Sequence, residues 1–170
     1  WNKLGNFRKA IEMFEKAAEI MKEKNGETCP ELSSQYSNLA MANVQLNDQL
    51  QAISWLEKAL HVDETTYGMS HPYVAQDYLN LGKMWKKQGD AVKATDYYQK
   101  ALEVQIKLSG EKSLEVSGIY NDIAQLAFDQ GIFDMALEKF RQALAIDRQL
   151  YSGSNLKIST KLKSIADTLK

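Results

Sequence analysis

The residues of this chain that could carry out chemistry are few, and their spacing forms no catalytic set. Cys29 is the only cysteine, and the two histidines are His61 and His71. A metal site needs three or four ligands of this kind held together, and an activated nucleophile needs a base beside it. The chain reaches neither requirement, so we expect structural roles for all three residues and no metal site.

A short segment is similar to the end of a phosphate-binding loop. Residues 110–113 have the sequence Gly-Glu-Lys-Ser. Such a loop also needs an earlier glycine at a fixed spacing and a strand before it, and this chain offers neither. Pairs of opposite charge such as Glu12 and Lys16, four residues apart, are typical of a solvated helix face. The sequence therefore predicts neither enzyme activity nor a cofactor.

Composition restricts the partners and the setting. The chain has 21 Lys and Arg against 22 Asp and Glu, and its net charge of −1 argues against general affinity for nucleic acid or acidic membranes. A single cysteine allows no internal disulfide, and no apolar stretch is long enough to cross a bilayer. We therefore expect an intracellular, cytoplasmic protein that does not insert into membranes.

A period of 42 residues organises the whole chain. Two columns of alanines keep this spacing, Ala10, Ala52, Ala94 and Ala136 in one and Ala17, Ala59, Ala101 and Ala143 in the other. We use the word column for residues that share one position in successive repeats. A fixed period of this kind indicates a solenoid, in which each repeat packs mainly against the next.

Each repeat carries two apolar stripes with helical spacing. The first stripe consists of Leu32, Tyr36, Leu39 and Ala40, and the second of Ala52, Leu56, Ala59 and Leu60. Both have the spacing i, i+4, i+7 and i+8 that places residues on one face of an α-helix. Each repeat is therefore expected to be a pair of amphipathic helices that bury their apolar faces only when repeats are stacked. The predicted fold class is an all-α superhelix of antiparallel helix pairs.

Capping and turn residues occur at the expected helix ends. The column before each first helix holds Cys29, His71, Ser113 and Asn155. Between the two helices, Asn47 and Gly89 tolerate a left-handed backbone and are each followed by an aspartate that can cap the next helix. Gly5 lies in the same column, so a turn is expected there as well. Tight turns at these places require antiparallel helices.

At this point the repeats resemble the tetratricopeptide repeat family. The residues that match the family's series in type and spacing are Tyr78, Leu81, Gly82, Trp85, Ala94, Tyr98 and Ala101. The longer period, with His-Pro-Tyr-Val-Ala at residues 71–75 and Ala-Leu-Glu-Val at residues 101–104, resembles the kinesin light chain type. The resemblance implies a tetratricopeptide-repeat solenoid in which the first helices line a concave groove.

The repeat boundaries predict one array over residues 1–170. We expect a partial first repeat at 1–26, full repeats at 27–68, 69–110 and 111–152, and a partial last repeat at 153–170. The chain is therefore expected to be a fragment of a longer protein, with flanking repeats or domains.

The helix face opposite the first apolar stripe is the candidate peptide-binding groove. Its residues are Asn38, Met41, Gln45, Gln76, Leu79, Asn80, Lys83, Lys86, Lys87, Asn121, Gln125 and Phe128. The amides of Asn38 and Asn80 can bond a peptide backbone as donors and as acceptors. Leu79, Met41 and Phe128 offer apolar contacts, although Phe128 fits the edge of the core equally well. Such a groove suits an extended peptide or a helix of a partner.

The charge preference of this groove has two interpretations. Lys83, Lys86 and Lys87 make one wall basic, which resembles the preference for acidic peptides among kinesin light chain type repeats. Alternatively, Asp122 and Asp129 in the next repeat neutralise these lysines. The sequence thus predicts a protein-interaction adaptor or scaffold, with an acidic linear motif as a candidate partner. The alternative function is a structural spacer that binds through its edges or convex face.

Overall fold

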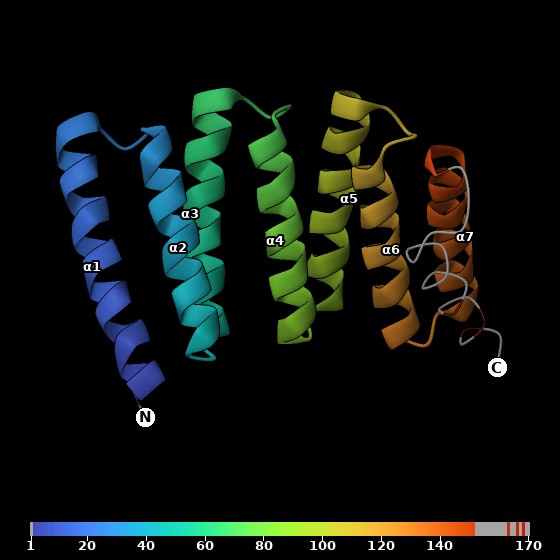
Figure 1. Cartoon of the computed structure of the whole chain (residues 1–170), viewed down its shortest axis with the longest axis horizontal. Helices are drawn as coiled ribbons and strands as arrows, with labels where there is room; N and C mark the ends of the chain where they lie inside the picture. The colour runs from blue at the N-terminus through green and yellow to red at the C-terminus, as the bar shows by residue number, and fades with distance from the viewer. Residues whose placement is uncertain (1, 152–162, 164–165, 167, 169–170) are drawn as a thin grey trace.

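The computed structural model describes residues 2–151 together with Lys163, Ala166 and Thr168. The helices in this part are α1 (Asn2–Asn25), α2 (Pro30–Gln45), α3 (Gln49–Tyr67), α4 (Pro72–Gln88), α5 (Ala91–Ser109), α6 (Leu114–Asp129) and α7 (Phe133–Leu150). Along the length of the molecule, successive helices run in opposite directions, and α3 and α5 lie behind α2, α4 and α6 (Figure 1). The prediction of an all-α superhelix is confirmed.

The alanine columns form the contacts between helices. The most extensive packing joins α2 to α3, α4 to α5, and α6 to α7, and smaller contacts join each pair to the next. Six alanines of the two columns have 0% of their surface exposed, namely Ala52, Ala94, Ala136, Ala59, Ala101 and Ala143. Because a methyl group is short, these positions let neighbouring helices approach closely and fill the space between them.

One contact requires a residue even smaller than alanine. A Cβ atom built on Gly82 of α4 would lie 2.6 Å from Cδ1 and 2.7 Å from Cε1 of the Tyr98 ring. The column of Gly82 otherwise contains Ala40, Ala124 and Ala166, and the column of Tyr98 otherwise contains Phe14, Leu56 and Phe140. The bulkiest residue of one column therefore packs against the smallest residue of the other.

The turns between paired helices have the predicted chemistry. Asn47 and Gly89 adopt positive φ angles of 59° and 88°. The aspartates that follow them cap the next helices, since Asp48 accepts a hydrogen bond from the N–H of Gln51 at 3.1 Å and Asp90 accepts one from Lys93 at 3.0 Å. These bonds satisfy N–H groups that have no partner within the helix.

The predicted helix starts are also observed. His71 Nδ1 accepts a hydrogen bond from the N–H of Tyr73 at 3.3 Å, and Ser113 Oγ accepts one from Val116 at 3.2 Å. Cys29 is the N-terminal cap residue of α2 but makes no capping hydrogen bond with its side chain. Asn155 lies outside the described residues.

The expected turn at Gly5 is wrong. Helix α1 begins at Asn2 and continues through Gly5 without a break. Glycine disfavours a helix by about 1 kcal/mol relative to alanine, which is too little to end one by itself. At Asn47 and Gly89 the chain reverses because a complete helix precedes the turn and packs against the next one. The described residues on both sides of Gly5 belong to α1 itself, so no such reversal occurs there.

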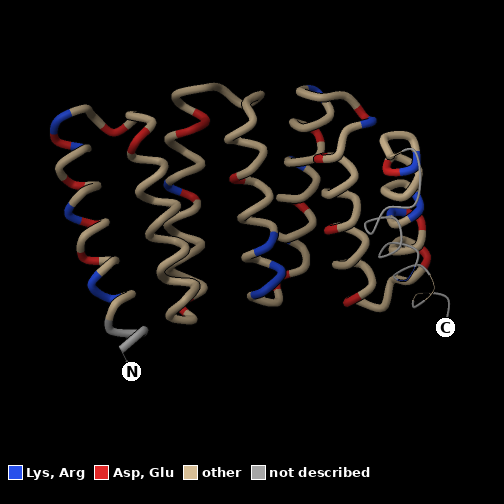
Figure 2. The backbone as a smooth tube through the Cα atoms, viewed as in Figure 1, with Lys and Arg blue, Asp and Glu red and all other residues tan. Residues whose placement is uncertain are grey.

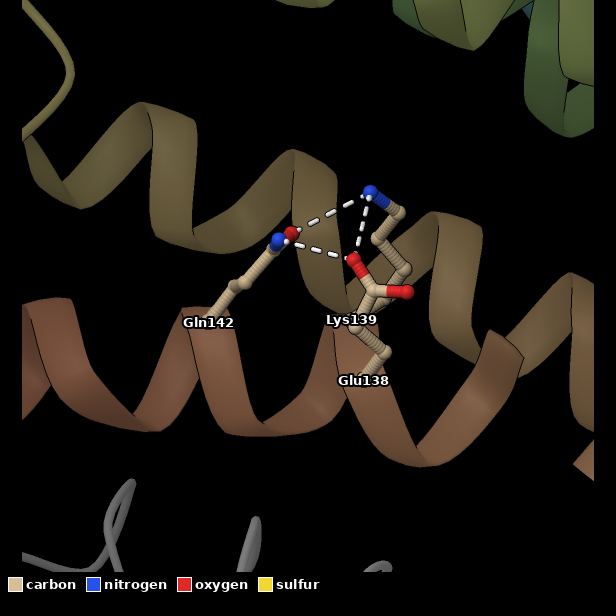
Figure 3. A network of polar contacts seen from close by, with 3 residues as sticks. All are labelled: Glu138, Lys139 and Gln142. Atoms are coloured by element: carbon tan, nitrogen blue, oxygen red, sulfur yellow. Dashed lines mark hydrogen bonds and ion pairs between the residues drawn. The ribbon is translucent and has the colours of Figure 1, made fainter. Parts of the chain in front are cut away.

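A polar network helps α7 to pack on α6. Gln142 accepts a hydrogen bond from Lys139 Nζ at 3.2 Å and donates one to Glu138 at 3.1 Å (Figure 3). The same Lys139 Nζ lies 5.4 Å from the ring centroid of Tyr120 on α6. A cation–π interaction of this kind contributes about 0.5–2 kcal/mol. The network therefore holds the ammonium group where it contacts the neighbouring helix.

The repeat register can be tested with one charge placed at two positions of α5. Ala101→Glu puts a carboxylate at a position with 0% exposure, whereas Val92→Glu puts the same charge at one with 81% exposure. A buried unpaired charge costs several kcal/mol, so only Ala101→Glu should lower the melting temperature strongly. Thermal melts followed by circular dichroism measure this, and equal melting of the two variants would contradict the register.

The contact between α4 and α5 gives a second test. Gly82→Ala should destabilise the protein by about 1–3 kcal/mol, because overpacking against Tyr98 outweighs the better helix propensity of alanine. Adding Tyr98→Leu should recover part of this loss, since it recreates the combination of Ala40 and Leu56 found in the preceding repeat. Urea unfolding of the two single variants and the double variant measures the coupling. Additive effects would show that the two positions do not compete for space.

Candidate functional site

A pocket of about 480 Å³ lies between α2 and α4 and reaches α3 at its base. We call it the α2–α4 pocket. Three predicted groove residues, Asn38, Gln76 and Asn80, line it. Gln76 Nε2 donates a hydrogen bond to Asn80 Oδ1 at 3.0 Å, which fixes the orientation of both amides. The structure thus brings polar side chains from α2 and α4 together around one hollow.

Two carboxyl groups lie deep in this pocket. Asp63 of α3 and Asp77 of α4 are each only 5% exposed, and both line the cavity. Within the described residues, Asp77 Oδ2 has no hydrogen-bond partner. Burial raises the pKa of Asp77 to about 8, and the charge of Asp63, a hydrogen bond shared with Asp63 and the charge of Glu64 act in the same direction. At neutral pH the Asp77 carboxyl group is therefore mostly protonated.

Other repeats show that the fold does not need a carboxyl group at position 77. The same column holds Ile119 in the next repeat, and Ile119 is 1% exposed in the core. By contrast, Asp147, which shares the column of Asp63, accepts a hydrogen bond of 2.5 Å from Ser117 Oγ. Asp147 thus shows how a repeat of this kind accommodates a buried aspartate, whereas the Oδ2 atom of Asp77 has no hydrogen-bond partner among the described residues.

An aromatic cluster forms one side of the pocket. Tyr67 at the end of α3 and Tyr73 at the start of α4 both line the cavity. Their ring centroids are 5.3 Å apart in an edge-to-face arrangement, and the His71 ring stacks on Tyr67 at 4.3 Å. Because His71 also caps α4, the helix start holds these rings in place. The pocket therefore combines carboxyl groups with aromatic surface.

The predicted basic wall is largely paired with acidic residues. Lys83 Nζ lies 3.4 Å from Asp122 Oδ2, and Lys86 Nζ lies 2.8 Å from Asp129 Oδ2. Figure 2 shows basic positions at the end of α4 beside acidic positions along α6. Lys87 is exposed and has no ion pair among the described residues. Acidic residues of the neighbouring helix therefore neutralise two of the three lysines, Lys83 and Lys86, in line with the second interpretation of these charges.

The remaining predicted groove residues differ in exposure. Met41 is 67% exposed, and Gln45 is exposed as well. Leu79 is half-buried and packs against the main core. On α6, Asn121 and Gln125 are half-buried, and Gln125 donates a hydrogen bond to Asp129 at 2.9 Å.

Phe128, for which two positions were possible, lies at the edge of the core. It packs against a cluster that includes Ala124 and Phe140, and its ring centroid is 5.6 Å from that of Phe133. Because the Phe128 ring packs against this cluster, less of its surface is open to a ligand than at a position in the groove.

The sequence analysis missed Asp63, Asp77, Tyr67 and Tyr73 as site residues. The column of Asp77 holds Gln35, Ile119 and Lys161 in the other repeats, so an aspartate there does not interrupt an apolar column. The closeness of Asp63 to Asp77 gave no signal, since these residues belong to different helices.

In the described part of the chain, no group of three or more His, Cys, Asp and Glu side chains is arranged to hold a metal ion. Among the same residues, no helix combines the length and the hydrophobicity that a membrane crossing requires.

Comparisons with known proteins agree with this architecture. The tetratricopeptide repeat family matches residues 2–65 and 73–149. The chain therefore belongs to the tetratricopeptide repeat family. This membership supports a general role in protein interaction, as an adaptor with protein partners. A search of curated protein sequences gives no match.

Solved structures define the type of repeat. BtubC (BKLC) from P. vanneervenii is 26% identical, with a TM-score of 0.84 over 98% of this chain and 66% of that protein. A Podosopora anserina protein with nearly identical TPR-like repeats, named after the kinesin light chain, is 17% identical, with a TM-score of 0.81 over 96% of this chain and 78% of its own. The repeats are thus similar in fold to those of a protein named after the kinesin light chain.

The buried carboxyl pair predicts a pH-dependent stability. The folded pKa of Asp77 is about 8 against an ordinary value of 3.8, so between these values the folded chain keeps a proton that the unfolded chain loses. The stability that this proton provides is present at low pH and falls as pH rises from about 4 to about 8, by up to about 1.4 kcal/mol per pH unit. The acidic groups facing Asp77 are Asp63 and Glu64 of α3 and Glu31 of α2.

Unfolding in urea at several pH values measures this dependence. Asp77→Asn mimics the protonated form, so this variant should resemble the original chain near pH 4 and be more stable than it near pH 8. Asp134→Asn removes an exposed carboxyl group on α7 and should keep the original slope. If Asp77→Asn also kept that slope, Asp77 would have an ordinary pKa.

Proposed function

We propose that this chain is an adaptor that binds an extended peptide or a helix of a protein partner in the groove lined by α2, α4 and α6. The observation that supports this proposal most directly is the α2–α4 pocket, with Asn38, Gln76 and Asn80 along it. Because Gln76 occupies the carbonyl oxygen of Asn80, the NH₂ group of Asn80 is left as a donor for a peptide carbonyl. An intracellular location remains an expectation.

An acidic linear motif remains our prediction for the partner at the far end of α4. An acidic side chain would compete there with Asp122 for Lys83 and with Asp129 for Lys86. Exposed ion pairs contribute only about 0.2–1 kcal/mol each, so this competition costs little. Lys87, which is exposed, could bind such a side chain directly. These lysines would therefore influence orientation and association rate more than affinity.

The alternative of a structural spacer has one specific observation in its favour. Leu50 and Val92 share a column at the first turns of α3 and α5, and they are 62% and 81% exposed. Apolar residues repeated along an edge suit contact with a neighbouring protein. A spacer of this kind would tolerate substitutions in the groove.

Selection from a displayed library of random heptapeptides tests the adaptor proposal. The chain should enrich a family of related sequences, and some of them should carry acidic residues. A synthetic peptide from that acidic group should bind the double variant Lys83→Glu and Lys87→Glu about tenfold more weakly, because two favourable charge contacts become repulsive.

The matched control is Lys107→Glu with Lys112→Glu, which changes the net charge equally at exposed positions outside the groove. Equal affinity of the peptide for both double variants would exclude the basic wall. Absence of any enriched sequence would contradict peptide binding in the groove and favour the spacer.

A further inference from the structure

We propose that the α2–α4 pocket binds a basic side chain of the partner, the guanidinium group of an arginine or the ammonium group of a lysine. This inference rests on the proposed peptide-binding function and specifies which side chain the groove anchors. The pocket lies toward the start of α4, whereas Lys83, Lys86 and Lys87 lie toward its end. The pocket would attract a positive charge, whereas the lysines would attract a negative one.

The buried carboxyl groups are the first observation. Asp77 is 95% buried, since only 5% of its surface is exposed, and its Oδ2 atom has no hydrogen-bond partner among the described residues. A buried polar atom without a partner costs free energy, and a cationic donor would remove that cost. Asp63 lies beside it, and Glu31 lines the same cavity. A guanidinium group has five N–H donors in one plane, which suits two carboxyl groups at once.

The aromatic cluster is the second, independent observation. Tyr67 and Tyr73 present ring surface beside the carboxyl groups, and His71 holds both rings by stacking and edge contacts. Aromatic faces attract cations by about 0.5–2 kcal/mol, and they also pack against the alkyl stem of Lys or Arg. Carboxyl groups flanked by aromatic rings therefore match both parts of a basic side chain.

Neither a structural requirement nor a metal ion accounts for the carboxyl pair. A structural requirement would extend to the next repeat, yet Ile119 occupies the position of Asp77 there without loss of packing. A metal ion would need a third ligand, and no group of three or more His, Cys, Asp and Glu side chains in the described part is arranged for one. The pocket also opens on the face that carries the amides of Asn38 and Asn80, where a peptide is proposed to lie.

A double-mutant cycle tests the proposal. Heptapeptides selected on the original chain should share an arginine or lysine at one position. For a synthetic arginine peptide from this group, we expect replacement of arginine by citrulline, which is similar in shape but uncharged, to weaken binding at least tenfold. With Asp77→Asn the same replacement should have a clearly smaller effect, because a bound guanidinium group can displace the proton of Asp77 but an amide cannot become charged, so Asp63 alone is left to pair with the cation. Isothermal titration calorimetry gives the four dissociation constants.

Controls separate the two proposals. Asp134→Asn also removes one carboxyl group, from the exposed start of α7, and should leave the full citrulline effect. Circular dichroism would confirm that Asp77→Asn is folded, and Tyr73→Leu provides a second pocket variant on exposed ring surface. Selected peptides without a common basic residue, or a citrulline effect of undiminished size in Asp77→Asn, would overturn the basic-side-chain proposal alone. Failure to select any peptide would overturn both proposals.

Discussion

The solenoid depends on close contact between small residues of one helix and large residues of its neighbour. Six alanines in two columns are completely buried, and Gly82 leaves just enough room for the ring of Tyr98. Since each repeat supplies only part of every interface, a change at one of these positions affects the packing of two helices at once. This constraint explains why these columns vary least along the chain. It also leaves the outward faces of α2, α4 and α6 free to differ.

Asp77 is a buried polar group that this packing does not explain. In the next repeat its column holds Ile119, which is buried in the core, whereas Asp77 is buried beside Asp63 and its Oδ2 atom has no hydrogen-bond partner among the described residues. Local departures from the rules that stabilise a fold tend to occur at functional sites, where the cost is tolerated for another reason. The raised pKa of Asp77 fits that cost, because a retained proton avoids a second negative charge beside Asp63.

The sequence predicted the helices well because their pattern and their stability have the same cause. The stripes that identified each helix are the faces that pack, and Asp48 and Asp90 cap helices through local bonds that need no tertiary information. The placement of Asn38 and Asn80 on one face also follows from helix geometry alone. The pocket could not be predicted in this way, because Asp63 and Asp77 meet only through the packing of α3 on α4. For the same reason, the pairing of Lys83 with Asp122 stayed one of two alternatives.

The fold itself explains the basic charges at the end of α4, but it does not explain the buried carboxyl group of Asp77 near its start. Lys86 and Lys87 lie in the last turn of α4, where the helix dipole favours a positive charge by about 0.3–1 kcal/mol. Lys86 also pairs with Asp129, so a basic wall at this end arises without any ligand. Neither the dipole nor an ion pair compensates the carboxyl group of Asp77, which lies deep in the second turn of the same helix. The acidic pocket is therefore stronger evidence for a bound partner than the basic wall that the sequence first indicated.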